Sequence, residues 1–238
     1  MKNGTPPKKK EDGRQHRSDG ARSRQAILNA ASELATIEGL GGLSIARLAD
    51  HVGMSKSGLF AHFKSKEELQ LATIDTASAI VDREVMQPTM AAPPGVSRIN
   101  AFCEAYFSHL EREVFPGGCF FISVAAEFDG KSGPLRDYAV KAYQDILGKF
   151  NEMVLEAKEL GELDQSEETS QLAFELDAFM LCVNFAHLFF RDPTAMARGR
   201  EAIRERLARA MPLTKKGSGG TRSRVPERKA ARRSGKNH

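Results

Sequence analysis

The stretch from Ser44 to Phe63 constrains the fold of this chain more than any other. Ser44 can cap a short helix, and the apolar residues after it repeat at helical spacing until Gly53, where a positive φ can end the helix. Ser55 can cap a second short helix. Two short helices about three residues apart are typical of a helix-turn-helix. An ordinary corner between two helices has the same spacing, so spacing alone leaves both interpretations open.

The outward face of the second helix favours DNA recognition. It carries Lys56, Ser57, Gly58 and His62, which are small or cationic and include no carboxylate. A recognition helix needs such a face, because its residues enter a polyanionic major groove about 12 Å wide.

A further helix is predicted directly after Phe63. Ser65 and Glu68 have the S-x-x-E spacing of a capping box, in which each residue satisfies a free backbone N–H of the other. The first turn of that helix offers free amides and Lys66 to a DNA phosphate.

These residues together resemble a known family. The pattern Arg24-x-x-Ile27-Leu28-x-Ala30-Ala31-x-x-Leu34-x-x-x-Glu38-Gly39, followed by Ser44 to Phe63 and Lys66-x-x-Leu69, resembles the DNA-binding domain of the TetR (tetracycline-repressor-like) regulators. Two departures stand out. Phe60 lies where the family usually has Tyr, and Ala35 lies where a Phe usually fills the core, so Ile37 or Leu40 is expected to supply that packing.

The resemblance implies an all-α protein with an N-terminal three-helix domain that contains the helix-turn-helix, followed by a larger C-terminal helical domain for effector binding and dimerisation. We predict a disordered basic tail over 1–21, the DNA-binding domain over 22–71, the second domain over 72–212 and another disordered basic tail over 213–238. The expected DNA-binding residues are Ser44, Ser55, Lys56, Ser57, Leu59, Phe60, His62 and Lys66.

Charge is strongly segregated along the 238 residues. The formal net charge is +4, yet residues 1–24 carry +5 and residues 213–238 carry +8, which leaves −9 on residues 25–212. A high isoelectric point is therefore no evidence for a basic DNA-binding face. The tails can add salt-sensitive, sequence-independent affinity for nucleic acid, or they can simply solubilise the protein.

The remaining pattern is helical throughout. We predict a first helix over 22–38, a fourth over 66–86 that ends before Pro88, and further helices over about 96–114, 119–128, 135–160, 164–191 and after Pro193. In the family the fourth helix transmits ligand binding to the DNA-binding domain. The last two helices look like half of an intermolecular four-helix bundle, which predicts a homodimer.

The second domain offers candidate effector-binding residues. Aromatic and a few polar side chains, of the kinds that line small-molecule pockets, are Phe102, Tyr106, Phe120, Phe121, Tyr143, Phe179, Asn184 and His187. The alternative is that nearly all of them are core residues. Their composition predicts an apolar or aromatic effector. Cys119 follows Pro116-Gly117-Gly118 at a predicted helix start, where amide dipoles lower a thiol pKa, so it is also a candidate redox thiol.

We find no nucleophile elbow, no Gly-rich phosphate loop after a strand and no metal-binding spacing among the histidines or the three cysteines. The sequence therefore predicts no enzyme, no cofactor and no metal site, and it contains no apolar stretch for a membrane or a signal peptide. The predicted function is a cytoplasmic transcriptional regulator, a repressor released from an inverted-repeat operator by a small molecule. Two alternatives are a helical small-molecule or thiol sensor with weak DNA binding, and an architectural nucleic-acid binder that works through its basic tails.

Overall fold

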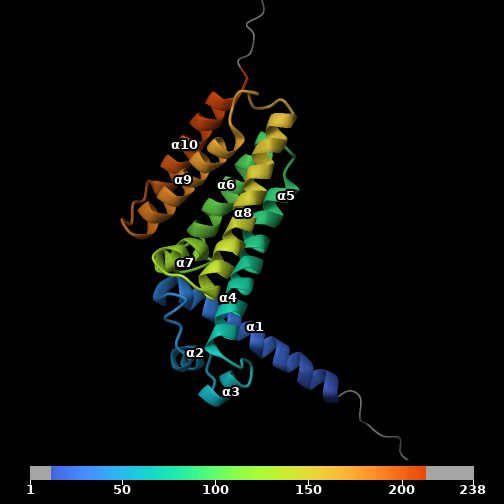
Figure 1. Ribbon diagram of the computed structural model, residues 1–238, viewed down its shortest axis with the longest axis vertical. Coiled ribbons are helices and arrows are strands. Elements are labelled where there is room, and N and C mark those ends of the chain that lie inside the picture. The colour runs from blue at the N-terminus through green and yellow to red at the C-terminus, as the bar shows by residue number, and fades with distance from the viewer. Residues whose placement is uncertain (1–11, 213–238) are drawn as a thin grey trace, which may run out of the picture.

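The computed structural model describes residues 12–212, which form helices joined by turns and loops (Figure 1). Residues 1–11 and 213–238 lie outside the described residues. The predicted C-terminal tail and the first half of the predicted N-terminal tail therefore lie outside them too. Within the described part the predicted all-α class is confirmed. In chain order the elements are α1 (Asp12–Glu38), α2 (Ile45–His51), α3 (Lys56–Phe60), α4 (Lys66–Val81), the π-helical turn η1 (Asp82–Met86), α5 (Gln87–Ala91), α6 (Val96–Glu111), α7 (Phe120–Phe128), α8 (Pro134–Glu159), α9 (Thr169–Leu188) and α10 (Ala195–Ala210).

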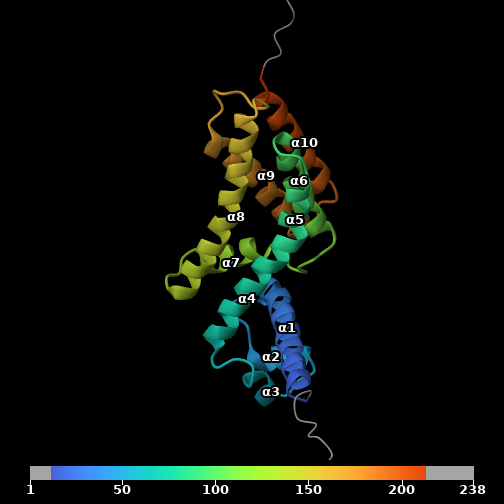
Figure 2. The ribbon, with the colours of Figure 1, turned by 90° about the vertical axis from the view of Figure 1, so that its right-hand side faces the viewer.

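The small domain consists of α1, α2, α3 and the start of α4, and it forms one end of the molecule (Figures 1 and 2). Its helices meet over side chains that expose 2% or less of their surface, among them Ile27, Leu48, Leu59, Phe63 and Leu69. This is the predicted three-helix arrangement. The apolar stripes of three short helices close one small core here, because none of them could bury its own stripe alone.

Leu40 supplies the packing that Ala35 cannot. Leu40 is fully buried, whereas Ile37 exposes 62% of its surface. Of the two residues that the sequence offered for this position, only Leu40 therefore fills the core. The chain reverses after α1 at Gly39, whose φ of +84° is readily adopted by glycine, and this turn carries Leu40 inward.

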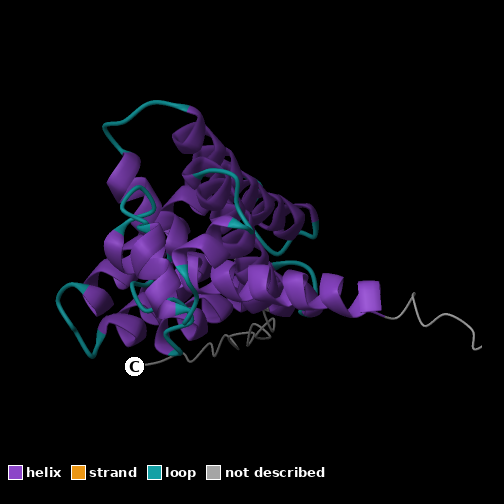
Figure 3. Ribbon diagram, turned by 90° about the horizontal axis from the view of Figure 1, so that it is seen from below, coloured by secondary structure: helices purple, strands orange, loops and turns teal. Residues whose placement is uncertain are grey.

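α1 begins at Asp12, so the prediction of a disordered tail is wrong for residues 12–21. This segment contains no proline, and a helix that already exists gains one backbone hydrogen bond for each residue that it adds. The packed second half of α1 supplies the nucleus, and the first half extends beyond the other helices (Figures 1 and 3).

The helix that starts at Lys66 continues beyond Met86, so its predicted end is wrong. Pro88 lacks an N–H, and its ring crowds the carbonyl four residues earlier. The π-helical turn η1 lies directly before this proline and shifts the hydrogen-bonding register, so that α5 can follow without a break. The hydroxyl of Thr89 donates to the carbonyl of Val85 at 2.6 Å and satisfies that group.

The larger domain is built around α6, which packs against α8, α9 and α10. α9 and α10 run antiparallel as neighbours on one side, and α8 crosses the domain beside them (Figures 1 and 2). The predicted end of α9 at about Arg191 is three residues too late, and its cap is Glu168, whose carboxylate accepts from the amides of Ser170 and Gln171.

The two domains are joined through α7 as well as through α4. The carboxylate of Glu127 in α7 accepts from the amide of Gly41, at 2.9 and 3.2 Å, in the loop after α1. The amide of Gly117 donates to the hydroxyl of Thr36 at 3.0 Å. A Cβ at position 117 would collide with the Thr36 carbonyl, so only glycine allows this close approach. α7 and the loop before it are thus each fixed to the small domain by a hydrogen bond.

Candidate functional site

The predicted helix-turn-helix is formed by α2 and α3. The chain turns at Gly53, whose φ is +67°, and α3 begins after Ser55. The hydroxyl of Ser55 accepts from the amide of Gly58 at 3.0 Å, as a capping residue should. Ser44 takes the predicted N-cap position of α2, but its side chain does not make the expected capping hydrogen bond.

The four candidate residues of α3 fall into two groups. Lys56, Ser57 and Phe60 are exposed, and Phe60 presents 53% of its surface despite its aromatic ring. Leu59 is fully buried between the helices. Its prediction as a DNA-contacting residue is therefore wrong, because a side chain that fills the core of the domain cannot reach a base.

The start of α4 flanks this face. The hydroxyl of Ser65 accepts from the amide of Glu68 at 3.0 Å, and the Glu68 carboxylate accepts from the amide of Lys64 at 2.8 Å, close to the predicted capping box. The ammonium group of Lys66 donates to the carbonyl of Gly41 at 2.7 Å. Lys66 thus ties α4 to the loop after α1, and its contact with a DNA phosphate, like that of the half-buried His62, stays a prediction.

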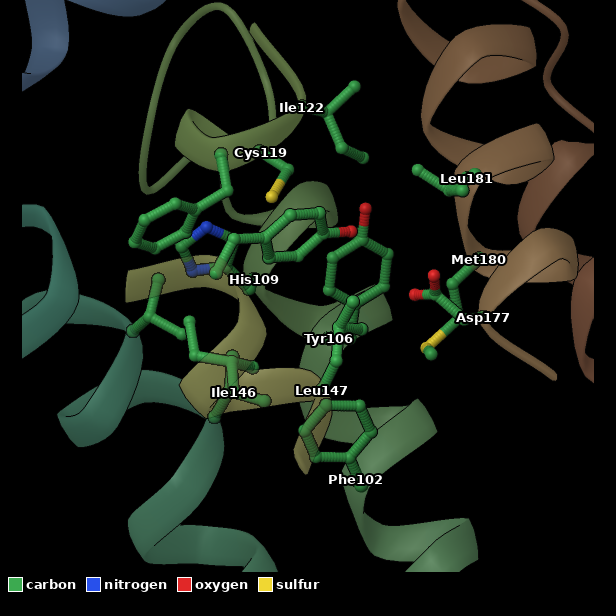
Figure 4. A pocket seen from close by; sticks show the side chains of 14 residues that line it. Phe102, Tyr106, His109, Cys119, Ile122, Ile146, Leu147, Asp177, Met180 and Leu181 are labelled. Carbon is green, nitrogen blue, oxygen red and sulfur yellow. The ribbon is translucent and has the colours of Figure 1, made fainter. Parts of the chain in front are cut away.

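A small cavity of about 40 Å³ lies inside the larger domain. Four of the eight predicted effector-binding residues line it, and these are Phe102, Tyr106, Phe121 and Tyr143. The other lining residues are Val81, Val85, His109, Cys119, Ile122, Ile146, Leu147, Asp177, Met180 and Leu181 (Figure 4). The cavity is therefore enclosed by the α4–η1 junction, α6, α7, α8 and α9.

The other four predicted residues lie elsewhere. Phe120 is fully buried in the core. Phe179 faces a groove between α9 and α10. The side-chain oxygen of Asn184 accepts from the amide of Cys119 at 3.0 Å, so Asn184 fixes the start of α7. His187 is half-buried near the end of α9 and does not line the cavity. Helical spacing identified the apolar faces, but it could not show which face borders the cavity.

Two polar lining residues were missed. His109 exposes 2% of its surface, neither ring nitrogen has a hydrogen-bond partner among the described residues, and burial lowers its pKa to about 4. Burial raises the pKa of the Asp177 carboxyl to about 6. Both side chains interrupt apolar helical stripes in the sequence, and that interruption was the signal that could have identified them.

The environment of Cys119 contradicts the predicted low thiol pKa. Cys119 lies at the N-cap of α7, but it is almost completely buried, and burial raises its pKa. Backbone amides of Phe121 and Ile122 act in the opposite direction and do not outweigh the loss of hydration. A thiol that stays protonated is a poor nucleophile, so the redox interpretation loses its physical basis.

The described residues hold no group of His, Cys, Asp or Glu side chains arranged to bind a metal ion. No helix within 12–212 combines the length and apolarity that crossing a membrane requires.

Comparison with known proteins accounts for both parts of the architecture. Residues 27–73 match the family described as bacterial regulatory proteins of the tetR family, and residues 95–203 match the family described as the tetracyclin repressor-like C-terminal domain. The chain belongs to the TetR family. Members of this family are transcriptional regulators that bind operator DNA and small ligands as dimers. The family therefore confirms the predicted class of DNA-binding regulator and the prediction that the chain is no enzyme.

Individual relatives are distant. The transcriptional activator FasR of Mycolicibacterium smegmatis is 32% identical over 90 residues, which are 38% of this chain and 41% of that protein, so the match spans less than half of that relative. A TetR regulator from Chloroflexus aurantiacus J-10-FL, at 23% identity and a TM-score of 0.75, covers 82% of this chain and 98% of its own. AibR in complex with isovaleryl coenzyme A and operator DNA has 19% identity, a TM-score of 0.61 and coverages of 80% and 98%. These two structures share the fold.

Proposed function

We propose that this TetR-family protein is a repressor that reads an inverted-repeat operator as a homodimer and is released from it by a small molecule. The observation that carries the proposal is the face of α3. It presents Lys56, Ser57 and Phe60 on a helix that is capped and held from behind by buried Leu59. Such a face suits a major groove, because it offers a cation, a small hydroxyl and an apolar edge without a carboxylate.

The DNA-contacting residues divide by role. We assign base contacts to Lys56, Ser57 and Phe60. Ser44, Ser55, His62 and Lys66 are assigned to the phosphate backbone. Two copies related by a two-fold axis would place their α3 helices about 34–36 Å apart, in successive major grooves. Because it reads chromosomal DNA, such a regulator would act in the cytoplasm.

The dimer interface is assigned to α9 and α10. Phe174, Phe185, Phe189 and Phe190 expose between 53% and 71% of their surfaces at and just beyond α9. The last three rings pack together, with centroids 5.0 to 5.2 Å apart. An exposed aromatic patch of this kind marks a contact surface, and burial against a second copy would complete a four-helix bundle.

The cavity is suited to control the spacing of the two DNA-binding domains. Val81 and Val85 line it from the α4–η1 junction, and Phe121 and Ile122 line it from the start of α7. Both segments continue to the small domain. A cavity of about 40 Å³ is smaller than the roughly 300–1,000 Å³ of ordinary ligand pockets, so an apolar effector would have to separate these helices to enter. Ligand binding would then favour a second conformation.

The decisive experiment selects binding sites from random duplex DNA with the full chain. We expect the wild-type protein to enrich an inverted repeat. Lys56→Glu should lose this enrichment. The control Lys141→Glu, which makes the same charge reversal at an exposed position of α8, should retain it. An enrichment that does not depend on Lys56 would contradict the assignment. A reporter under the selected operator tests direction, and activation in place of repression would overturn the repressor part.

A second measurement tests the dimer. Phe185→Glu should produce a monomer in sedimentation equilibrium, whereas Leu155→Glu, on the exposed face of α8, should remain dimeric. A Phe185→Glu protein that stays dimeric would place the interface elsewhere.

The alternative in which the basic tails drive DNA binding is tested with residues 12–212 alone, which we expect to select the same operator as the full chain. Binding that is lost with the tails and in moderate salt would favour that alternative.

A further inference from the structure

The cavity lining carries one formal charge. Among the described lining residues there is no Lys or Arg, and Asp177 is the only carboxylate. His109 adds no positive charge near neutral pH, because burial holds its pKa at about 4. The lining therefore has a net negative charge and lacks any cationic side chain that could form an ion pair with an anion. A coenzyme A thioester, which carries phosphates, would find no cationic partner there.

Asp177 differs from the other carboxylates of α9. Glu175 forms ion pairs with Arg206, and Glu168 caps the helix through backbone amides. Asp177 is half-buried and has no hydrogen bond or ion pair to any described residue. Partial removal of this unpaired carboxylate from water is the cause of its raised pKa. Its position is therefore explained neither by packing nor by pairing within the described chain.

Aromatic rings surround the same space. Phe121 and Tyr143 stack with centroids 5.6 Å apart. In Figure 4 the Asp177 carboxylate lies to one side of the Tyr106 ring, and His109 and Cys119 lie to the other. The faces of aromatic rings attract cations through their quadrupoles, and this attraction grows where water is excluded. The neutral His109 ring, whose nitrogens are both unpartnered, can accept a hydrogen bond from an N–H group.

We infer that the effector is a small organic cation, an amine or quaternary ammonium on an aromatic or apolar body, whose positive group pairs with Asp177 beside the ring of Tyr106. The inference rests on the proposed role of this cavity as the effector site and names the class of ligand. The apolar body would lie against Phe102, Phe121 and Tyr143.

The test uses probes that differ only in charge. The first set is 2-phenylethylammonium, 2-phenylethanol and phenylacetate, and a second set carries the same three kinds of head group on a naphthylmethyl body. Affinity for the full-length protein is measured by calorimetry, at pH 7.5 and moderate salt. The variants are Asp177→Asn, which keeps the shape of the side chain, and the control Asp145→Asn, which removes an exposed carboxylate of α8 that pairs with Lys141.

We expect the cation to bind at least tenfold more tightly than the alcohol in the wild type and in Asp145→Asn. That advantage should disappear in Asp177→Asn, while the alcohol binds both proteins alike. Equal or tighter binding of the alcohol or the anion would overturn the inference, as would an advantage that survives in Asp177→Asn or the absence of cation binding up to millimolar concentration. A loss of dimerisation in Asp177→Asn without any change in cation affinity would also overturn it, because Asp177 would then serve the subunit contact.

Failure of this inference is distinguishable from failure of the proposed function. Site selection from random DNA reports on the regulator alone, whatever binds the cavity. A selected operator together with cavity binding that ignores charge would leave the function and reject the cation. Charge-dependent binding at Asp177 without any selected operator would reject the function and leave the cation site.

Discussion

The DNA-binding face and the cavity differ in how their polar groups are satisfied. Around α3 the hydroxyls of Ser55 and Ser65 and the carboxylate of Glu68 each accept from a backbone amide within four residues. In the cavity the hydroxyl of Tyr106 and both nitrogens of His109 have no partner among the described residues. The first region has its shape fixed by local contacts and meets its ligand with exposed side chains. The second holds polar groups that no described residue satisfies.

The largest effect should separate two neighbours on α3. Leu59→Ala removes a fully buried side chain, so it should lower the free energy of unfolding by about 2–5 kcal/mol. Phe60→Ala removes an exposed ring and should change it by less than about 0.5 kcal/mol, while it weakens operator binding. Urea unfolding at fixed protomer concentration, with operator titration, measures both. A stable Leu59→Ala protein would contradict the burial of that side chain.

The next effect concerns acid stability and belongs to the cavity. His109 has a folded-state pKa of about 4, below the ordinary value of 6.5, so the unfolded chain binds the proton first as pH falls. The neutral His109 therefore contributes fully to stability above pH 6.5. This contribution is lost on acidification, and the loss in the free energy of unfolding amounts to about 3 kcal/mol at pH 4. His109→Leu should lack this loss.

The measurement for His109 is the difference in the free energy of unfolding between wild type and His109→Leu from pH 7 to pH 4. Asp177 acts in the opposite direction, because its raised pKa favours the folded state as pH falls through 6, and this contribution cancels in the difference. Glu84 and Arg112 face His109 with opposing effects on its pKa. A difference that does not vary with pH would mean that His109 is partnered or hydrated.

A smaller effect should appear where the two regions meet. Glu127→Ala leaves the part-buried amide of Gly41 without its acceptor, so we expect a loss of about 1–3 kcal/mol in the free energy of unfolding and weaker release of DNA by ligand. Lys131→Ala removes the exposed ion pair to the same carboxylate and should cost less than about 1 kcal/mol. Equal losses in the two variants would argue against the contact between Glu127 and Gly41 as the important one.

The smallest effect compares a buried hydroxyl in the cavity with a hydrogen-bonded hydroxyl at the DNA-binding face. Tyr106→Phe deletes a buried hydroxyl that lies near the Cys119 thiol, a weak partner, and makes no ordinary hydrogen bond to a described residue, so the free energy of unfolding should stay within about 1 kcal/mol of wild type or rise. Ser55→Ala, which removes a satisfied cap, should instead lower it by about 0.5–2 kcal/mol. A clear destabilisation by Tyr106→Phe would reveal a partner for its hydroxyl, such as an ordered water.

Local patterns identified most helices correctly but failed where distant segments decide. The S-x-x-E pattern located the start of α4, and glycine located the ends of α1 and α2, because these signals act within one turn of the backbone. Pro88 was interpreted as a helix end, although η1 accommodates it. Cys119 was assigned a low pKa from its helix position, although burial by the surrounding helices prevails.

The sequence by itself determined the helix-turn-helix, the all-α class and the family, because caps, turns and apolar periodicity depend on neighbours a few residues apart. Only the tertiary structure decided that Leu59 is buried and Phe60 exposed. The same holds for the cavity, where His109 and Asp177 come from helices far apart in the chain to line one space. Helical periodicity shows which residues share a face, but which faces meet, and which polar groups lose water there, follows from the packing of the whole domain.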